Sequence, residues 1–317
     1  MNGIQNSNLG LKYQNKTAVN DLAAKPSFAA KNNSSEVSEQ PKPKKSPWPW
    51  FGLGVFAPLL SPVISLKLLK AVKKDADLGI NRKSVDKVLK HMSEENKLAE
   101  KGVKFEFLKN GSKKAEVLNK NYGGASYSFS KKQGVNKVSA TVEKASLSLH
   151  EVGHAINRNC TKMGKGYWNI LEKMKLFETK LPKSLRKFFP LSPITVPVYA
   201  SFILYLIGNA VKIEKPKNKN PENEEKQNKK FSISKFIHDN LGKLTLAAFA
   251  PMLIDESTAT IRALKATKKA SPEILKPLRK NLLLAFGSYL AITATTLVST
   301  LSLRKFSDTQ KENLKKN

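Results

Sequence analysis

Two histidines and a glutamate near the middle of the chain have the types and spacing of a metal site. They occur as His150-Glu-Val-Gly-His154 within the stretch from Ser146 to Asn157. Residues four apart lie on one face of a helix, about 6 Å apart along its axis, so both imidazoles can reach one ion. The H-E-x-x-H spacing favours zinc, with Glu151 as the general base that takes a proton from water as it attacks a peptide carbonyl.

The residues around this motif predict the helix that must hold these side chains. Gly153 leaves room for close approach at the metal face, and Asn157 with Arg158 ends the apolar pattern. The alternative is a surface helix with two solvated histidines, which the apolar context disfavours. The apolar side of the predicted helix consists of Leu147, Val152, Ala155 and Ile156.

Two histidines do not complete a catalytic zinc site, which normally takes three protein ligands. The best candidate for the third is Glu256, in an acidic pair that closes an apolar run, and Asp255 beside it is the direct rival. Cys160 offers another solution, because Asn157 and Cys160 occupy the positions where H-E-x-x-H-x-x-G-x-x-H enzymes have Gly and their third His. Without any metal, the acidic pair would still stabilise the start of a helix.

Length, charge and hydropathy predict a membrane protein. The chain has 317 residues, a formal net charge of +31 and 40% hydrophobic residues, which fall in long uncharged runs between lysine-rich stretches. A nucleic-acid partner is not expected, because no nucleic-acid motif is present and anionic lipid headgroups are a simpler partner for the basic residues. The single cysteine, Cys160, excludes an intrachain disulfide.

The chain begins with two segments that precede any predicted domain. Residues 1–46 are polar, lack a signal-peptide pattern and are predicted to be disordered. Residues 47–72 are predicted to associate with a membrane, because their uncharged run is edged by tryptophans and lysines. Pro58 and Pro62 within this run favour a kinked or re-entrant helix over a regular spanning one.

Residues 73–187 are predicted to form a zincin-like domain around the H-E-x-x-H helix. Apolar residues from Ser84 to about Ala99 follow a helical period, and those from Val103 to Phe107 alternate as in a strand. Two further strands, over 123–129 and 135–142, read as a hairpin that leads into the motif. An exposed strand edge beside the metal can hold an extended peptide by main-chain hydrogen bonds.

Two longer uncharged runs predict transmembrane helices in the second half of the chain. Residues 188–211 and 281–303 lack charges over 24 and 23 residues, which as helices exceed a hydrocarbon core of about 30 Å. A polar linker over 212–230 follows the first run. Residues 231–280 then hold a second hairpin arm and the helix with the third ligand, and residues 304–317 form a basic tail.

The metal site constrains how these segments cross the membrane. His150 and Glu256 must reach the same ion, so an even number of crossings separates them and residues 188–254 form a helical hairpin. Lysine and arginine are abundant on the side of the motif, which places the active site in the cytoplasm of a protein integral to the cell inner membrane. The C-terminus is then outside, where Arg304 and Lys305 fit badly.

His150-Glu-Val-Gly-His154, the apolar hairpin that follows and Glu256-Ser-Thr-Ala259 together resemble the membrane-integrated gluzincin peptidases. That family includes the bacterial heat-shock protease HtpX and the CAAX prenyl proteases, and its H-E-x-x-H motif is followed by transmembrane segments and E-x-x-A-D. The resemblance covers about residues 84–265 and implies that Glu256 is the third zinc ligand. Thr260 stands where the family has an Asp that is taken to orient a ligand histidine.

The leading hypothesis is a mainly α-helical membrane protein with a small β-sheet that hydrolyses peptide or protein substrates with one Zn²⁺ per chain. His150, His154 and Glu256 would be the ligands and Glu151 the general base. One alternative is a site-2-type intramembrane metalloprotease that uses Asp255, although charges flank its motif helix on both sides. Another is a catalytically inactive scaffold. No Tyr or other His can be placed beside the metal as the group that stabilises an oxyanion.

Overall fold

The computed structural model describes residues 44–188, 190–210 and 232–315. In this part of the chain the predicted architecture, mostly helical with one small sheet, is confirmed. Most of the predicted tail over 1–46 and all of the predicted linker over 212–230 lie outside the described residues.

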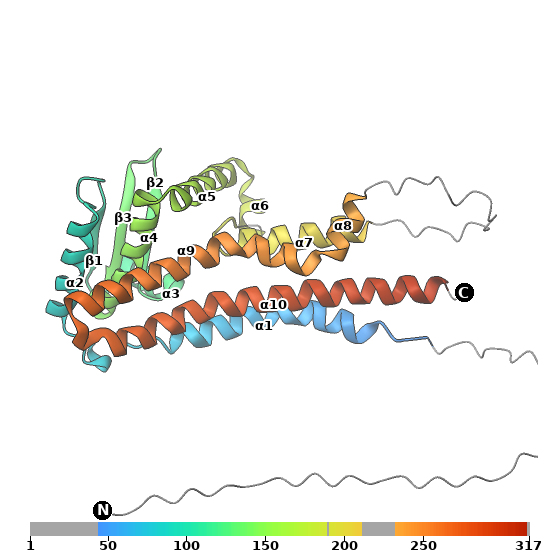
Figure 1. Ribbon diagram of the computed structural model, residues 1–317, viewed down its shortest axis with the longest axis horizontal. Helices are drawn as coiled ribbons and strands as arrows, with labels where there is room; N and C mark the ends of the chain where they lie inside the picture. The colour runs from blue at the N-terminus through green and yellow to red at the C-terminus, as the bar shows by residue number, and fades with distance from the viewer. Residues whose placement is uncertain (1–43, 189, 211–231, 316–317) are drawn as a thin grey trace, which may run out of the picture. The chain divides into compact units, whose positions relative to one another are not determined.

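Two long antiparallel helices, α1 (Trp48–Lys70) and α10 (Leu275–Lys315), lie side by side (Figure 1). Their seam is built from buried small residues of α1, and Ser65 Oγ donates a hydrogen bond to the carbonyl of Ser288 at 3.3 Å. A Cβ on Gly54 would lie 2.6 Å from the side chain of Leu303. Small residues therefore let the two helices approach closely along their length.

Helix α1 runs without a break through Pro58 and Pro62, where the sequence predicts a kinked or re-entrant segment. Each proline removes only one backbone hydrogen bond from the helical ladder. The long contact with α10 compensates for that loss, since the small residues of the seam recur at helical spacing on both sides of the prolines.

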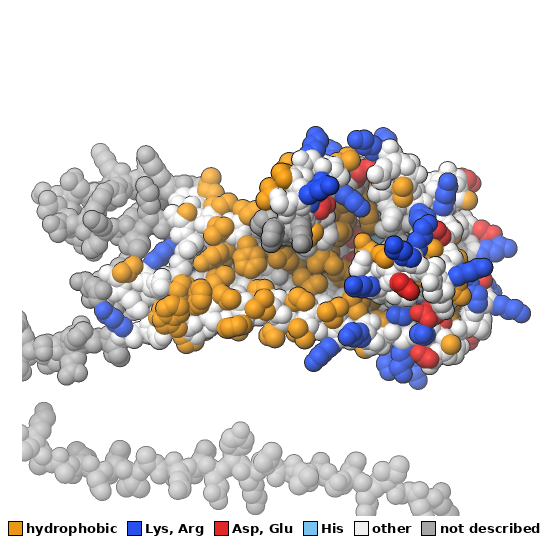
Figure 2. Space-filling model, turned by 180° about the vertical axis from the view of Figure 1, so that it is seen from behind, with side chains coloured by type: hydrophobic (Ala, Val, Ile, Leu, Met, Phe, Trp, Pro, Cys, Tyr) orange, Lys and Arg blue, Asp and Glu red, His pale blue; other side chains and the backbone are white. Residues whose placement is uncertain are grey.

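Both helices are long and apolar enough to cross a membrane. Only 17% of the apolar stretch of α1 and 28% of that of α10 is buried inside the protein, which argues against core helices of a water-soluble domain. Figure 2 shows hydrophobic side chains gathered over this part of the molecule, and lysines and arginines gathered over the part that holds the sheet. This surface favours membrane association.

Three more helices pack beside this pair: α7 (Thr195–Asn209), α8 (Ile233–Asp239) and α9 (Leu241–Ala270). The helix that the sequence predicts over 188–211 is shorter in the structure, because Pro190 and Pro193 precede α7 and disfavour helical backbone. Its 15 residues extend about 22 Å, less than a hydrocarbon core of about 30 Å.

The ends of several helices meet at the C-terminal end of α10. Asn313 donates to the carbonyl of Lys45 at 2.9 Å, and Lys311 donates to the carbonyl of Asn209 at 3.3 Å. His238 of α8 lies 3.0 Å from Asp308. The start of α1, the end of α7 and α8 therefore share one end of the bundle, opposite the sheet in Figure 1.

The sheet has three strands in the order β1-β3-β2, formed by β1 (Lys104–Leu108), β2 (Ala125–Ser130) and β3 (Val135–Thr141). β2 and β3 form the predicted antiparallel hairpin, with Tyr127 opposite Val138 in the register. β1 pairs in parallel with β3, which the connection through α3 (Lys113–Tyr122) allows. β2 is therefore an edge strand.

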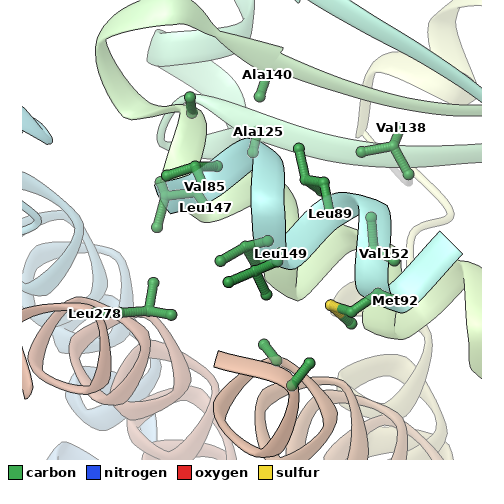
Figure 3. Close-up of a cluster of buried hydrophobic side chains, with 14 of the residues drawn as sticks. Val85, Leu89, Met92, Ala125, Val138, Ala140, Leu147, Leu149, Val152 and Leu278 are labelled. Carbon is green, nitrogen blue, oxygen red and sulfur yellow. The ribbon is translucent and has the colours of Figure 1, made fainter. Parts of the chain in front are cut away.

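The hydrophobic core fixes the motif helix α4 (Ser148–Cys160) between the sheet, α2 (Arg82–Glu95) and α9. Leu149 and Val152 of α4 are fully buried and meet Val85 and Met92 of α2, while Leu278 closes the core from α10 (Figure 3). The remaining elements are α5 (Lys162–Lys180), α6 (Lys183–Phe188), η1 (Ala76–Leu78), η2 (Val142–Leu147) and η4 (Pro272–Ile274).

Candidate metal centre

The two motif histidines and Glu256 converge on one point where α4 crosses α9. His150 Nε2 lies 3.0 Å from His154 Nε2 and 3.1 Å from Glu256 Oε2, and His154 Nε2 lies 3.6 Å from the same oxygen. All three side chains are buried. Residues more than a hundred positions apart in the chain thus form one compact group with the ligand types of a metal site.

These separations match the space that a tetrahedral zinc ion needs. Bonds of 2.0–2.1 Å at tetrahedral angles place neighbouring ligand atoms about 3.3 Å apart. The three observed separations, 3.0, 3.1 and 3.6 Å, lie around that value. His150, His154 and Glu256 therefore fit zinc as three ligands of one ion.

Each histidine is oriented by a second group at its other ring nitrogen. Asp255 Oδ2 lies 2.8 Å from His154 Nδ1, and Thr260 Oγ1 lies 3.2 Å from His150 Nδ1. With a proton on each Nδ1, both Nε2 atoms present lone pairs to the centre, which is the tautomer that a metal requires. Thr260 thus supports His150 from its Nδ1 side.

The other two ligand candidates from the sequence lie elsewhere. Asp255 is behind His154, at Nδ1, and is not in the convergent group. Cys160 is exposed and lies 3.0 Å from Lys101 Nζ. Asn157 reaches across to α9 instead, where it donates to Asp255 Oδ1 at 2.8 Å and so holds that carboxylate against His154.

The crossing of α4 and α9 is tight because Gly153 faces Ala259. A Cβ on Gly153 would lie 2.5 Å from Ala259 Cα and from its carbonyl oxygen, closer than any side chain fits. Arg262 Nε donates to Asn157 Oδ1 at 2.9 Å on the same side of the crossing. The absence of a side chain at Gly153 therefore sets the helix distance that brings Glu256 to the histidines.

The electrostatic potential at the centre favours a cation. Burial alone would lower the pKa of His154, but the carboxylates of Glu256 and Asp255 raise it well above its ordinary value. Burial alone would raise the pKa of Glu256, but His154 and His150 hold it well below its usual range. Two buried carboxylates thus stabilise positive charge here, whether a proton or a metal ion carries it.

Glu151 lies beside this group, half-buried, on the side that faces β2. Burial raises the pKa of its carboxyl group, while a hydrogen bond from the backbone of Tyr127 in β2 opposes the shift. A raised pKa suits a general base that must accept a proton near neutral pH. The predicted base and the predicted edge strand therefore occur together.

Three aromatic residues near the centre were not predicted from the sequence. The ring of Trp168 on α5 lies 6.0 Å from that of His154, and its indole Nε1 is buried without a partner among the described residues. Tyr167 is close enough to Asp255 and Glu256 for their negative charges to act on its hydroxyl group. Tyr289 of α10 interacts directly with Glu256. A phenol inside a predicted membrane span is a signal that could have pointed to Tyr289.

No protein-family model, curated protein or solved structure matches the chain. The resemblance to the membrane-integrated gluzincin peptidases therefore stays a prediction from the two sequence motifs.

Proposed function

We propose that this chain is a membrane-bound zinc endopeptidase with a zincin-like core, related to the membrane-integrated gluzincins. His150, His154 and Glu256 would hold one zinc ion, and Glu151 would act as general base. When bound, zinc supplies Lewis-acid chemistry, which polarises a carbonyl group and makes water more acidic.

The convergence of His150, His154 and Glu256 is the observation that carries the proposal. Two buried imidazoles and one buried carboxylate, with ligand atoms within 4.8 Å of one another, bring three metal-ligand types to one point of the core, where a bound cation would partner all three. Their Nδ1 atoms are supported by Asp255 and Thr260 in the way that ligand histidines usually are. The arrangement supports a catalytic site because three protein ligands leave a fourth position open.

Peptide binding follows from the position of β2. Its outer edge has no partner strand among the described residues, and the backbone of Tyr127 on β2 is next to Glu151. An extended peptide paired with this edge would run past the general base, and its carbonyl would meet the phenols of Tyr167 and Tyr289. A peptide with an N-methylated amide next to the cleaved bond should therefore be cut more slowly than its unmethylated parent.

The membrane arrangement is part of the same proposal. α1 and α10 would cross the bilayer. α7 and the first half of α9 would form a hairpin that enters the bilayer beside them and leads the chain back to the metal centre. The basic residues around the sheet would face the cytoplasm and anionic lipids of the cell inner membrane.

The main alternative is a catalytically inactive scaffold that keeps the metal for structure. A site-2-type intramembrane protease is less well supported, because Asp255 is at Nδ1 of His154 and the motif helix begins next to an ion pair between Lys74 and Glu143. Hydrolysis that depends on Glu151, the proposed general base, would distinguish an enzyme from a scaffold.

The test is the purified full chain with Glu151→Gln, compared with Glu116→Gln on the exposed face of α3. The first variant should keep its zinc and lose hydrolysis of a peptide library by about 10²- to 10⁴-fold, since only the base is removed. The control should keep both. Zinc binding with no hydrolysis by the unaltered protein would favour the scaffold.

A further inference from the structure

We propose that a pocket between α5 and α7 binds one acyl chain of an anionic phospholipid. The pocket has a volume of about 690 Å³, within the usual size range of ligand sites. It does not contain any residue of the metal centre, and its use does not depend on hydrolysis.

The walls of the pocket suit a hydrocarbon chain. Met174 and Phe177 of α5 form one wall, and Ala200, Phe202 and Ile203 of α7 contribute to the other. The lining exposes almost only apolar atoms, so a peptide backbone would leave its N–H and C=O groups without partners there. An acyl chain has no such groups to satisfy.

The open side of the pocket lies along an apolar helix surface. Ile203 and Leu206 line the pocket, yet 55% and 63% of their surface is exposed. Both residues belong to α7, which packs beside α10, a helix whose apolar stretch is also mostly exposed. A lipid chain can therefore enter from the side, without leaving hydrocarbon.

The charge at the pocket selects the headgroup. Among the described residues, Lys173 is the only charged one in the lining, and its side chain is exposed. Helix α5 carries five lysines against two glutamates. Glu178 of α5 acts on Tyr199 of the α7 wall, so the phosphate is expected on the side of Lys173.

The experiment uses the full chain in phosphatidylcholine nanodiscs that contain a small fraction of phosphatidylglycerol with a photoreactive acyl chain. Mass spectrometry of the crosslinked peptides should place label on α5 residues 173–177 and on α7 residues 196–203. Replacing the probe by photoreactive phosphatidylcholine should lower this labelling about fivefold, the effect of one lysine on an anionic headgroup.

Matched variants separate the pocket from the general lipid surface. Ala200→Trp should fill the pocket and remove its label, whereas Ile207→Trp, on the same helix but outside the lining, should leave it. Lys173→Gln should lower the preference for phosphatidylglycerol, and Lys175→Gln should not. Thermal unfolding in the same nanodiscs identifies any variant that fails to fold, and Ala200→Leu is the milder replacement in that case.

Unchanged pocket labelling in folded Ala200→Trp or Ala200→Leu would overturn the proposal. Equal labelling by the two lipids would overturn the role of Lys173, and displacement of the probe by a soluble peptide would assign the pocket to substrate instead. None of these results depends on zinc or on hydrolysis, so they are distinct from a failure of the proposed peptidase activity.

Discussion

Two close helix contacts in this molecule use small residues in the same way but serve different ends. At the seam of α1 and α10, hydroxyl groups mostly bond to backbone carbonyls, such as Ser65 to Ser288 and Thr293 to Tyr289. At the crossing of α4 and α9, polar side chains bond to other side chains across the contact, as Asn157 does to Asp255. Close packing alone therefore does not make a site. Metal-ligand side chains that converge from distant parts of the chain can make one.

The largest loss of zinc affinity should follow removal of the Glu256 carboxylate, where α4 crosses α9. Glu256→Ala should lose zinc affinity by more than the 10- to 100-fold that is usual for a supporting residue, because a ligand itself is lost. Asp255→Ala should fall within that range, and Cys160→Ser should bind zinc normally. Competition with a zinc chelator measures all three. A site emptied by Cys160→Ser but not by Glu256→Ala would reverse the assignment.

A methyl group added at each contact compares the two regions directly. Gly153→Ala should destabilise the fold by about 1–3 kcal/mol and weaken zinc binding, because its Cβ meets the backbone of Ala259. Gly54→Ala should have a smaller effect, since the two closest atoms to its Cβ belong to the Leu303 side chain, which can move, and the nearest backbone atom is 3.2 Å away. Gly52→Ala, with open space around its Cβ, is the control. Thermal unfolding and zinc content give the ranking, and equal effects at Gly54 and Gly153 would contradict it.

Removal of one hydroxyl should matter at the crossing and not at the seam. Thr260→Val should lower zinc affinity about 10- to 100-fold, because His150 loses the partner of its Nδ1. Thr293→Val removes a hydroxyl that bonds only within α10 and should leave zinc affinity unchanged. Thr260→Asp restores an acceptor and should retain most of the affinity. Normal zinc binding by Thr260→Val would show that His150 needs no such support.

A smaller effect is expected from a carboxyl group outside both contacts. Burial raises the pKa of Asp75, which accepts a hydrogen bond from the backbone N–H of Ser146 at 2.8 Å just before α4. The folded state then holds a proton on Asp75 more tightly than the unfolded state does. Its contribution to stability is greatest below the ordinary carboxyl pKa of about 4 and declines as the pH rises through the higher folded-state value.

Asp75→Asn should therefore remove part of the fall in stability with rising pH over that window. Unfolding midpoints between pH 4 and pH 7 test this, with Asp77→Asn as the neighbouring control. If the stability of the Asp75→Asn variant fell more steeply with rising pH than that of the unaltered protein, folding would lower the pKa of Asp75 and not raise it.

The sequence predicts the local parts of the site well. The spacing of His150 and His154 places both on one helix face, and alternation of apolar residues identifies the β2–β3 hairpin. These features depend on residues close together in the chain. Glu256 could be proposed only from its acidic pair and from the family resemblance, because its distance to the histidines depends on how α9 crosses α4.

The rest depends on tertiary contacts that no local pattern encodes. Thr260 supports His150 only at the helix distance that Gly153 allows, and Tyr289 reaches Glu256 from a helix that reads as a membrane span. The sequence also predicted that this helix begins at residue 188, whereas α7 begins at Thr195, after Pro190 and Pro193. Hydropathy alone does not show that prolines disfavour helical backbone before them.

The most direct test of the central claim is the X-ray absorption spectrum of zinc in the purified full-length protein. We expect about one zinc per chain, with nitrogen and oxygen ligands at about 2.0–2.1 Å and no sulfur. A protein that binds no zinc, or a spectrum with a sulfur ligand at about 2.3 Å, would contradict it.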